Sequence, residues 1–291
     1  MKIKPLAYNV AFVVSSRGNM QALTGCLTSI AMQQLLPCKV VIRLEGEIMG
    51  LSNFYFEQSV DLLRVMGIDV QIMCSKSSGV RRARTELLKS VAGYPYVWMG
   101  DDDCVYDSAC LSELIVAKDE AGKHVRDDVQ LGWVQGSKPD VNNRRGYKDF
   151  SIEVREGLKA NNDEGYNFFF TGPGKTVLCS SLDTGNVLFC MSAVCKNEGI
   201  GESPLEEMFN HTTPEYNSSG EDTLCALYLK SRSLYGVFRT SANCVHMEKQ
   251  VGGFDEFSAR KNYIAATAIK NGYVTEADAD LTLKTVLPWG K

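Results

Sequence analysis

The sequence lacks several features that would assign it to a class at once. It has no C-x-x-C pair among its 10 cysteines and no apolar run approaching the roughly 18 residues that cross a membrane. Residues 1–20 also lack the apolar core of a signal peptide. A zinc ribbon is therefore not expected, and neither is a disulfide framework. We expect reduced, mostly buried cysteines and a cytoplasmic location.

The chain also lacks a strong excess of either charge. Its 291 residues carry 31 Lys and Arg against 35 Asp and Glu, a net charge of −4. Such a charge does not attract nucleic acid or an anionic membrane, so any contact of that kind needs a local basic patch. No internal repeat or low-complexity tract is present, and 44% hydrophobic residues is ordinary for a globular protein. We expect a single domain, 1–291.

Strand and helix patterns alternate through the first hundred residues. Apolar β-rich runs predict strands at 10–14, 40–44, 70–73 and 96–99. Between them, apolar residues recur at helical spacing, as in Leu23, Leu27 and Ile30. This βαβ repetition predicts an α/β fold with a Rossmann-like, mostly parallel sheet flanked by helices, and a ligand crevice at the carboxyl ends of the strands.

The pattern is less regular after a helix near 111–118. Residues 119–182 are polar and read as a long insertion around one strand at 130–135, of the kind that forms a lid. An apolar strand then leads into a helix start at 184–194, and a helix follows from residue 221. Two strands at 234–238 and 242–246 and a helix at 257–270 complete the prediction.

Three carboxylates, Asp101, Asp102 and Asp103, follow the strand at 96–99 after a single glycine. Adjacent like charges repel unless a cation holds them, although a solvated loop would also tolerate them. Because the carboxyl ends of such strands are where α/β sheets bind ligands, a divalent cation with a phosphate-bearing ligand is the alternative.

Six short segments, taken in order, resemble one family. They are VVSSRGN, GVRRARTELL, WMGDDDCVYD, TGNVLF, GEDTLCALYL and NCVHME. Together they resemble the GT-A fold glycosyltransferases of the family 2 type, over residues 8–118 and 183–248, with Thr85 in place of the family's usual Asn. The resemblance implies a metal-dependent, inverting hexosyl- or pentosyltransferase that uses a nucleotide-sugar, a UDP-sugar being favoured, with Mn²⁺ or Mg²⁺.

The resemblance also implies roles for particular residues. Asp103 and His246 would bind the metal. The alternative for His246 is a structural role, as a hydrogen-bonded histidine at the end of a strand. The candidate donor-binding residues are Arg17, Glu45, Arg84, Asp101 and Asp102, of which Asp102 could instead face solvent. Asp222 would be the catalytic base and Glu221 would orient the acceptor or the helix, although acidic residues in a first turn also stabilise a helix through its dipole.

The same resemblance divides the chain into a nucleotide-sugar-binding half (1–118), an insertion (119–182), an acceptor and catalytic half (183–250) and a helical end (251–291). The acceptor stays open between a glycan, a small molecule and a hydroxymethylated base in DNA. A DNA acceptor, as in some bacteriophage enzymes, would place the protein in a host cytoplasm. The basic residues available to contact DNA phosphates are Arg81, Arg82, Arg144, Arg145 and Lys148.

Two other classes compete with the transferase. A nucleotidyltransferase would need a glycine-rich basic loop after the first strand, for which SSRGNMQ is too sparse. An inactive nucleotide-sugar-binding module would not need its acidic residues and His246. The segment GPGKT does not match the phosphate-binding loop motif, because Phe169 occupies the position where that motif requires its first glycine.

Overall fold

The computed structural model describes residues 8–45, 51–75, 79–124, 130–138, 176–179, 182–195, 208–209, 221–247, 263 and 265–275. The strands are β1 (Val10–Ser16), β2 (Lys39–Glu45), β3 (Asp69–Ser75), β4 (Tyr96–Asp101), β5 (Cys104–Tyr106), β6 (Gln130–Ser137), β7 (Thr176–Cys179), β8 (Asn186–Cys190) and β9 (Leu234–His246). The helices are α1 (Met20–Ala31), α2 (Leu51–Val65), α3 (Gly79–Ser90), α4 (Cys110–His124), α6 (Met191–Val194) and α8 (Glu221–Ser231).

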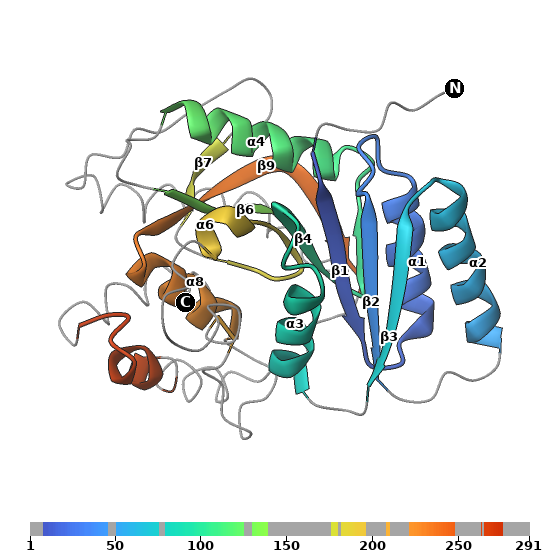
Figure 1. The fold of residues 1–291 in the computed structure, drawn as a ribbon, viewed down its shortest axis with the longest axis horizontal. Helices are drawn as coiled ribbons and strands as arrows, with labels where there is room; N and C mark the ends of the chain where they lie inside the picture. The colour runs from blue at the N-terminus through green and yellow to red at the C-terminus, as the bar shows by residue number, and fades with distance from the viewer. Residues whose placement is uncertain are drawn as a thin grey trace.

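One nine-stranded sheet runs through the described part of the molecule in the order β3-β2-β1-β4-β8-β6-β9-β5, and β7 pairs with β9 (Figure 1). Strands β3, β2, β1 and β4 are mutually parallel. The α/β fold class predicted from the alternating patterns is confirmed in this half, element by element. Short helical crossovers account for the parallel direction.

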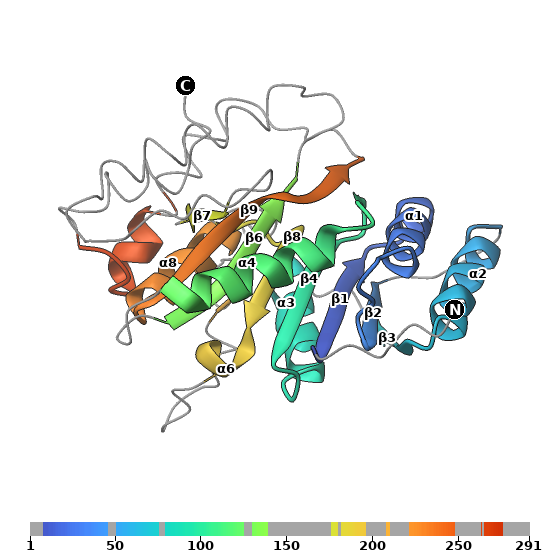
Figure 2. The same ribbon diagram turned by 90° about the horizontal axis from the view of Figure 1, so that it is seen from above.

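Alternation along β1 places helices on both faces of the sheet. Phe12 and Val14 belong to an apolar cluster with α1, α2 and α4, whereas Ala11 and Val13 pack in a second cluster with α3, α6 and α8. Figure 1 shows α3 on the side of β1 away from α1 and α2, and Figure 2 shows α2 and α8 toward opposite ends of the molecule. Because both faces are covered, β1 is apolar at consecutive positions.

The second half of the sheet mixes strand directions. Strand β8 is antiparallel to β4 and to β6, and β9 runs parallel to β6. The two strands predicted at 234–238 and 242–246 are one strand, β9, with a register shift where Gly136 opposes Arg239 and Ser137 opposes Asn243. The polar residues at 239–241 suggested a break, but an irregular pairing lets the strand continue through them.

The sequence did not predict β5 or β7. Both are too short to show a period of their own, and both pair with β9. Thr176 of the rejected GPGKT segment begins β7. Most of the predicted insertion, including residues 139–175, lies outside the described residues. Of the helix predicted at 257–270, the structure describes residue 263 and residues 265–270, which are helical.

All ten cysteines are free thiols, as expected, and seven of them are buried. In the part of the chain that the structure describes, every helix is too short or too polar to span a membrane.

Candidate active site

An aromatic cluster supports the end of β4. The ring of Trp98 lies edge-on to Phe12 and Tyr106, with ring centroids 4.9 and 4.8 Å apart. The Tyr106 hydroxyl crosses beneath Gly100, where an added Cβ would lie 2.0 Å from the hydroxyl oxygen. Only glycine fits at this position, so β4 and β5 approach closely and the turn between them is held in place.

Two hydrogen bonds attach the start of β8 to this cluster. The Tyr106 hydroxyl donates to the Gly185 carbonyl oxygen (2.7 Å), and the Trp98 indole N–H donates to Asn186 Oδ1 (3.1 Å). The Asn186 amide in turn donates to the carbonyl oxygens of Ser137 and Ala242. The Gly-Asn pair of the TGNVLF segment therefore connects β4, β5, β6 and β9, and the buried amide is fully used.

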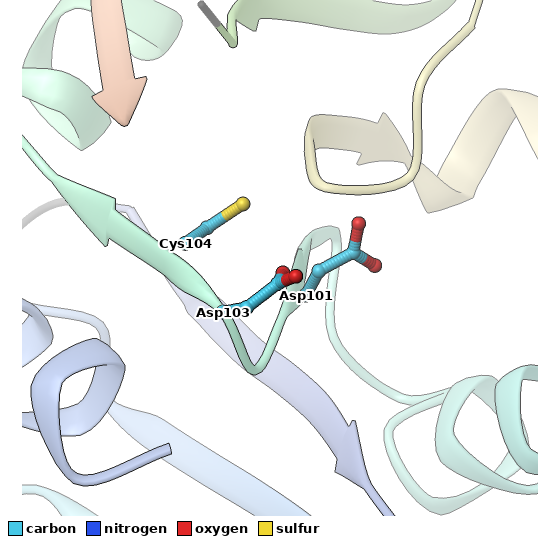
Figure 3. A group of neighbouring side chains, drawn as sticks. All are labelled: Asp101, Asp103 and Cys104. Carbon is cyan, nitrogen blue, oxygen red and sulfur yellow. The ribbon is translucent and has the colours of Figure 1, made fainter. Parts of the chain in front are cut away.

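Asp101, Asp103 and Cys104 come together at the turn from β4 to β5, with one potential ligand atom from each within 4.8 Å of the others (Figure 3). Cys104 is fully buried, and its hydrogen bond with Cys244, together with burial, raises the pKa of its thiol well above the usual value. A neutral thiol is a poor ligand for a hard cation. The two carboxylates are the better donors in this group.

His246 lies beside Asp103, the residue with which the family resemblance groups it. Antiparallel pairing of β5 with β9 sets Cys104 opposite His246, and His246 Nε2 lies 2.9 Å from Asp103 Oδ2. The hydrogen bond that the imidazole donates to Asp103 raises the pKa of His246, although burial opposes this. A carboxylate and an imidazole at this separation form a donor set that suits Mn²⁺, so these residues fit the metal that the resemblance implies.

Asp101 is held by two cations instead. Arg84 Nη2 lies 3.4 Å from its Oδ1, and Lys138 Nζ lies 3.0 Å from its Oδ2. Burial alone would raise the pKa of this carboxyl, but Lys138 and Arg84 together lower it to about 2. Asp101 is therefore ionised at any ordinary pH and already has two cationic partners.

Arg84 extends this group to the first turn of α8. Its guanidinium donates to Glu221 as well as to Asp101, and both side chains of the Arg84–Glu221 pair are 10% exposed. Next along α8, Asp222 has its pKa raised to about 7 by burial and by the charges of Glu221 and Asp183, against the opposing effect of Arg84. Its Oδ1 accepts a hydrogen bond from the Thr223 amide (2.7 Å). A carboxyl with this pKa can exchange a proton near neutrality.

Arg17 and Glu45 lie at the same edge of the sheet. Ser15 of β1 is in register with Asp101, and Ser16 with Leu44, so the ends of β1, β2 and β4 align. Arg17 is half exposed and its Nε lies 3.6 Å from Glu45 Oε2. Buried Arg43 also pairs with Glu45, and its Nε donates to Glu86 Oε2 on α3 (2.8 Å).

Asp102 lies in the β4–β5 turn and is partly exposed. Among the basic residues considered for DNA, Arg82 is exposed and pairs with Glu86 of its own helix at 2.8 Å. Arg144, Arg145 and Lys148 lie outside the described residues.

Three residues at this edge were missed from the sequence, namely Arg43, Lys138 and Asp183. Lys138 follows β6 directly, as Asp102 and Asp103 follow β4, and a charged residue directly after a strand was the available signal. Asp183 precedes TGNVLF, and Arg43 is a fully buried charge within β2, between the apolar residues Ile42 and Leu44. Lys138 pairs with Asp101 and Asp183, and Arg43 pairs with Glu86 as well as with nearby Glu45, so spacing along the sequence could not reveal the long-range contacts.

Comparisons with known proteins identify the fold of this chain but not its sequence family. No family model and no curated protein sequence matches this chain. Among solved structures, TarS residues 1–349 from S. aureus superpose with a TM-score of 0.59 at 16% identity, over 96% of this chain and 70% of that chain. TarS 1–349 in complex with UDP-GlcNAc matches with a TM-score of 0.58 at 15% identity, over 94% and 70% of the two chains.

A third similar structure is the mannosyltransferase PcManGT from Pyrobaculum calidifontis in complex with GDP-Man and Mn²⁺. Its TM-score is 0.61 at 13% identity, over 98% of this chain and 72% of that chain. At these identities the likeness concerns the fold, which it establishes across nearly the whole chain: the GT-A-like α/β fold predicted from the sequence is confirmed.

Proposed function

We propose that the protein is a glycosyltransferase that moves a hexosyl or pentosyl group from a nucleotide-sugar, a UDP-sugar being favoured, to an acceptor hydroxyl with inversion. Similar folds have been solved with UDP-GlcNAc and with GDP-Man and Mn²⁺, which supports this class. The observation that carries the proposal is the Arg84 bridge between Asp101 and the helix bearing Asp222. A donor-side carboxylate and a candidate base thus belong to one electrostatic group. The family 2 assignment, with Asp101–Asp103 as the D-x-D motif, stays a prediction.

Asp103 and His246 would hold the divalent cation. A bound Mn²⁺ or Mg²⁺ would supply positive charge for the diphosphate, whose negative charge grows as the leaving group departs. The raised pKa of His246 means that a proton competes with a metal ion for Nε2. Metal binding should therefore strengthen as the pH rises through the pKa of this imidazole.

Asp222 is the proposed general base. Inversion in one step requires a group that accepts the proton of the acceptor hydroxyl as that oxygen attacks the sugar carbon. A carboxyl with a pKa of about 7 is close to the working pH, which favours proton transfer in that step. Glu221, fixed by Arg84, would orient the acceptor or the start of α8.

The remaining candidates belong to the donor side. Glu45 and Arg17 would contact the base of the nucleotide, and Asp101 and Asp102 its ribose or sugar, at the aligned ends of β1, β2 and β4. This arrangement follows the rule that α/β sheets bind ligands at the carboxyl ends of their strands. The acceptor is one of three kinds: a glycan, a small molecule or a modified DNA base.

The test is a donor panel. The purified full chain is incubated with UDP-glucose, UDP-galactose, UDP-GlcNAc, UDP-xylose and GDP-mannose plus Mn²⁺, and release of UDP or GDP is measured with water as a surrogate acceptor. The same reactions with EDTA serve as the metal control, and donor binding is measured by calorimetry. We expect one donor to bind and release its nucleotide in a metal-dependent way. If none binds or turns over, the proposal is wrong.

A further inference from the structure

Lys138 lies between two carboxylates from different parts of the chain. Its Nζ is 3.0 Å from Asp101 Oδ2 and 2.8 Å from Asp183 Oδ1. The lysine follows β6, whereas Asp101 ends β4 and Asp183 precedes β8, so the ammonium connects three separate segments. The Lys138 side chain is only 12% exposed, and a charge so deeply placed needs such partners.

The backbone around this lysine leaves little room for it to move. A Cβ added to Gly185 would lie 2.5 Å from Lys138 Nζ and 2.7 Å from Asp101 Oδ2. The Gly185 amide donates to Asp183 Oδ1 (2.8 Å), the oxygen that also receives Lys138. The Asp183 amide donates to Gln135 Oε1 (2.7 Å). The Asp183 carboxylate is thus held by a backbone contact independent of the lysine, and the Asp101 carboxylate is held by Arg84 as well as by the lysine.

The neighbourhood carries many negative charges. Asp103 is two residues from Asp101, and Asp183 raises the pKa of Asp222. Two carboxylates fixed around a common point bind a cation strongly, and oxygen ligands of this kind suit a hard divalent ion as well as an ammonium. Lys138 occupies that position from within the chain.

We propose that Lys138 is a built-in cation that limits this end of the sheet to one divalent ion, by holding Asp101 and Asp183 so that only Asp103 and His246 receive metal. This rests on the proposed function for the identity of the metal pair. Asp101 lies close enough to Asp103 for the two carboxylates to share a metal ion. In the native protein, however, the Asp101 carboxylate is ion-paired with Lys138. Lys138 therefore determines which carboxylates bind metal.

The experiment counts Mn²⁺ ions bound to the full chain without donor, by electron paramagnetic resonance of the free ion during titration. The native protein should bind no more than one Mn²⁺. Lys138→Met keeps the length of the side chain and removes its charge, so it should bind one Mn²⁺ more than the native protein. Lys138→Arg keeps the charge and should show no gain. Adding Asp183→Asn to Lys138→Met removes half of the new site and should abolish the gain.

Lys118→Met is the matched control. Lys118 is also partly buried and paired, at 2.6 Å from Asp119, but it contacts the Tyr96 hydroxyl at the opposite end of β4 from Asp101. Its removal should leave the Mn²⁺ count unchanged. Lys138→Gln, whose amide can still donate to one carboxylate, serves as a second variant, and thermal unfolding checks that each variant is folded.

Two results would overturn the inference: two ions bound to the native protein, or equal counts for the native protein and the folded uncharged variants. The outcome of the donor panel, which tests the proposed function, does not depend on the Mn²⁺ counts of these variants. If the native chain binds no Mn²⁺ and Lys138→Met binds one, the role of Lys138 stands while the metal pair of the proposed function falls.

Discussion

Arg84 of α3 donates to Glu221 at the first residue of α8, a partner 137 positions away in the sequence. The same guanidinium reaches Asp101 at the end of β4 (3.4 Å). Burial alone would lower the pKa of this arginine, but the charges of Glu221, Asp101 and Asp222 raise it, so the guanidinium stays charged. The parallel half of the sheet and the α8 segment therefore meet in one ion-pair network.

Replacing Arg84 by methionine should lower the free energy of unfolding. The change removes the Arg84 partner of buried Glu221 and leaves Asp101 with Lys138, and removing one partner of a buried pair costs about 3–5 kcal/mol. Urea denaturation at neutral pH measures the loss. Arg82→Met is the control, because Arg82 is exposed and its pair with Glu86 should contribute less than about 1 kcal/mol. Equal effects of the two substitutions would contradict the network.

Asp222→Asn should separate catalysis from structure. The amide keeps the shape and can still accept from the Thr223 amide, but it cannot accept the acceptor's proton. Transfer should fall by about 10²–10⁴-fold with donor affinity unchanged. In the native protein the rate should rise with pH around the pKa of about 7. A joint loss of donor binding would assign Asp222 to the donor site instead.

The raised pKa of Asp222 also predicts how stability depends on pH. The folded carboxyl titrates near 7, whereas an unfolded Asp titrates near about 3.9. Between these values the folded state binds more protons, so this residue lowers stability as the pH rises through that window. Asp222→Asn should therefore gain stability relative to the native protein from pH 4 to pH 7 and hold that gain above it. Denaturation midpoints that stay parallel across this range would argue against the raised pKa.

Asp103→Asn should abolish Mn²⁺-dependent turnover, and His246→Ala should raise the Mn²⁺ concentration needed for half-maximal activity. A carboxylate contributes more charge to a divalent ion than a neutral imidazole does, so the histidine variant should partly recover at high Mn²⁺. Asp107→Asn is the control, since this exposed residue lies beyond β5. Full Mn²⁺-dependent activity of Asp103→Asn would remove Asp103 from the metal site.

Gly100→Ala should destabilise the β4–β5 turn. The new methyl would lie 2.0 Å from the Tyr106 hydroxyl and 2.9 Å from the Phe12 ring, so the aromatic cluster must shift at a cost of about 1–3 kcal/mol. Gly93→Ala is the matched control, because no atom other than those of Gly93 and its two chain neighbours lies within 4 Å of the added Cβ. Chemical denaturation compares the two variants. A Gly100→Ala protein as stable as Gly93→Ala would show that the turn has room to spare.

The local pattern of the sequence determined the strands and helices of the first half. Strand β1 and helix α1 show the apolar spacing of a buried strand and of a one-sided helix, and hydrophobic periodicity depends only on neighbouring residues. The carboxylates after β4 and the acidic start of α8 were also visible, because a strand end or a helix start is a local feature. The short strands β5 and β7 were not, since they exist only through pairing with β9.

Tertiary structure alone decided which charges meet. The sequence identified Asp101, Arg84 and Glu221 separately, but neither their ion pairs nor the position of Lys138 between Asp101 and Asp183 follows from spacing. An ion pair forms where folding brings two side chains within a few ångströms, and its partners here are 17 to 137 positions apart. The hydrophobic pattern determines the sheet, and the sheet aligns the ends of its strands. Only that alignment brings the charged side chains of the site close enough to pair.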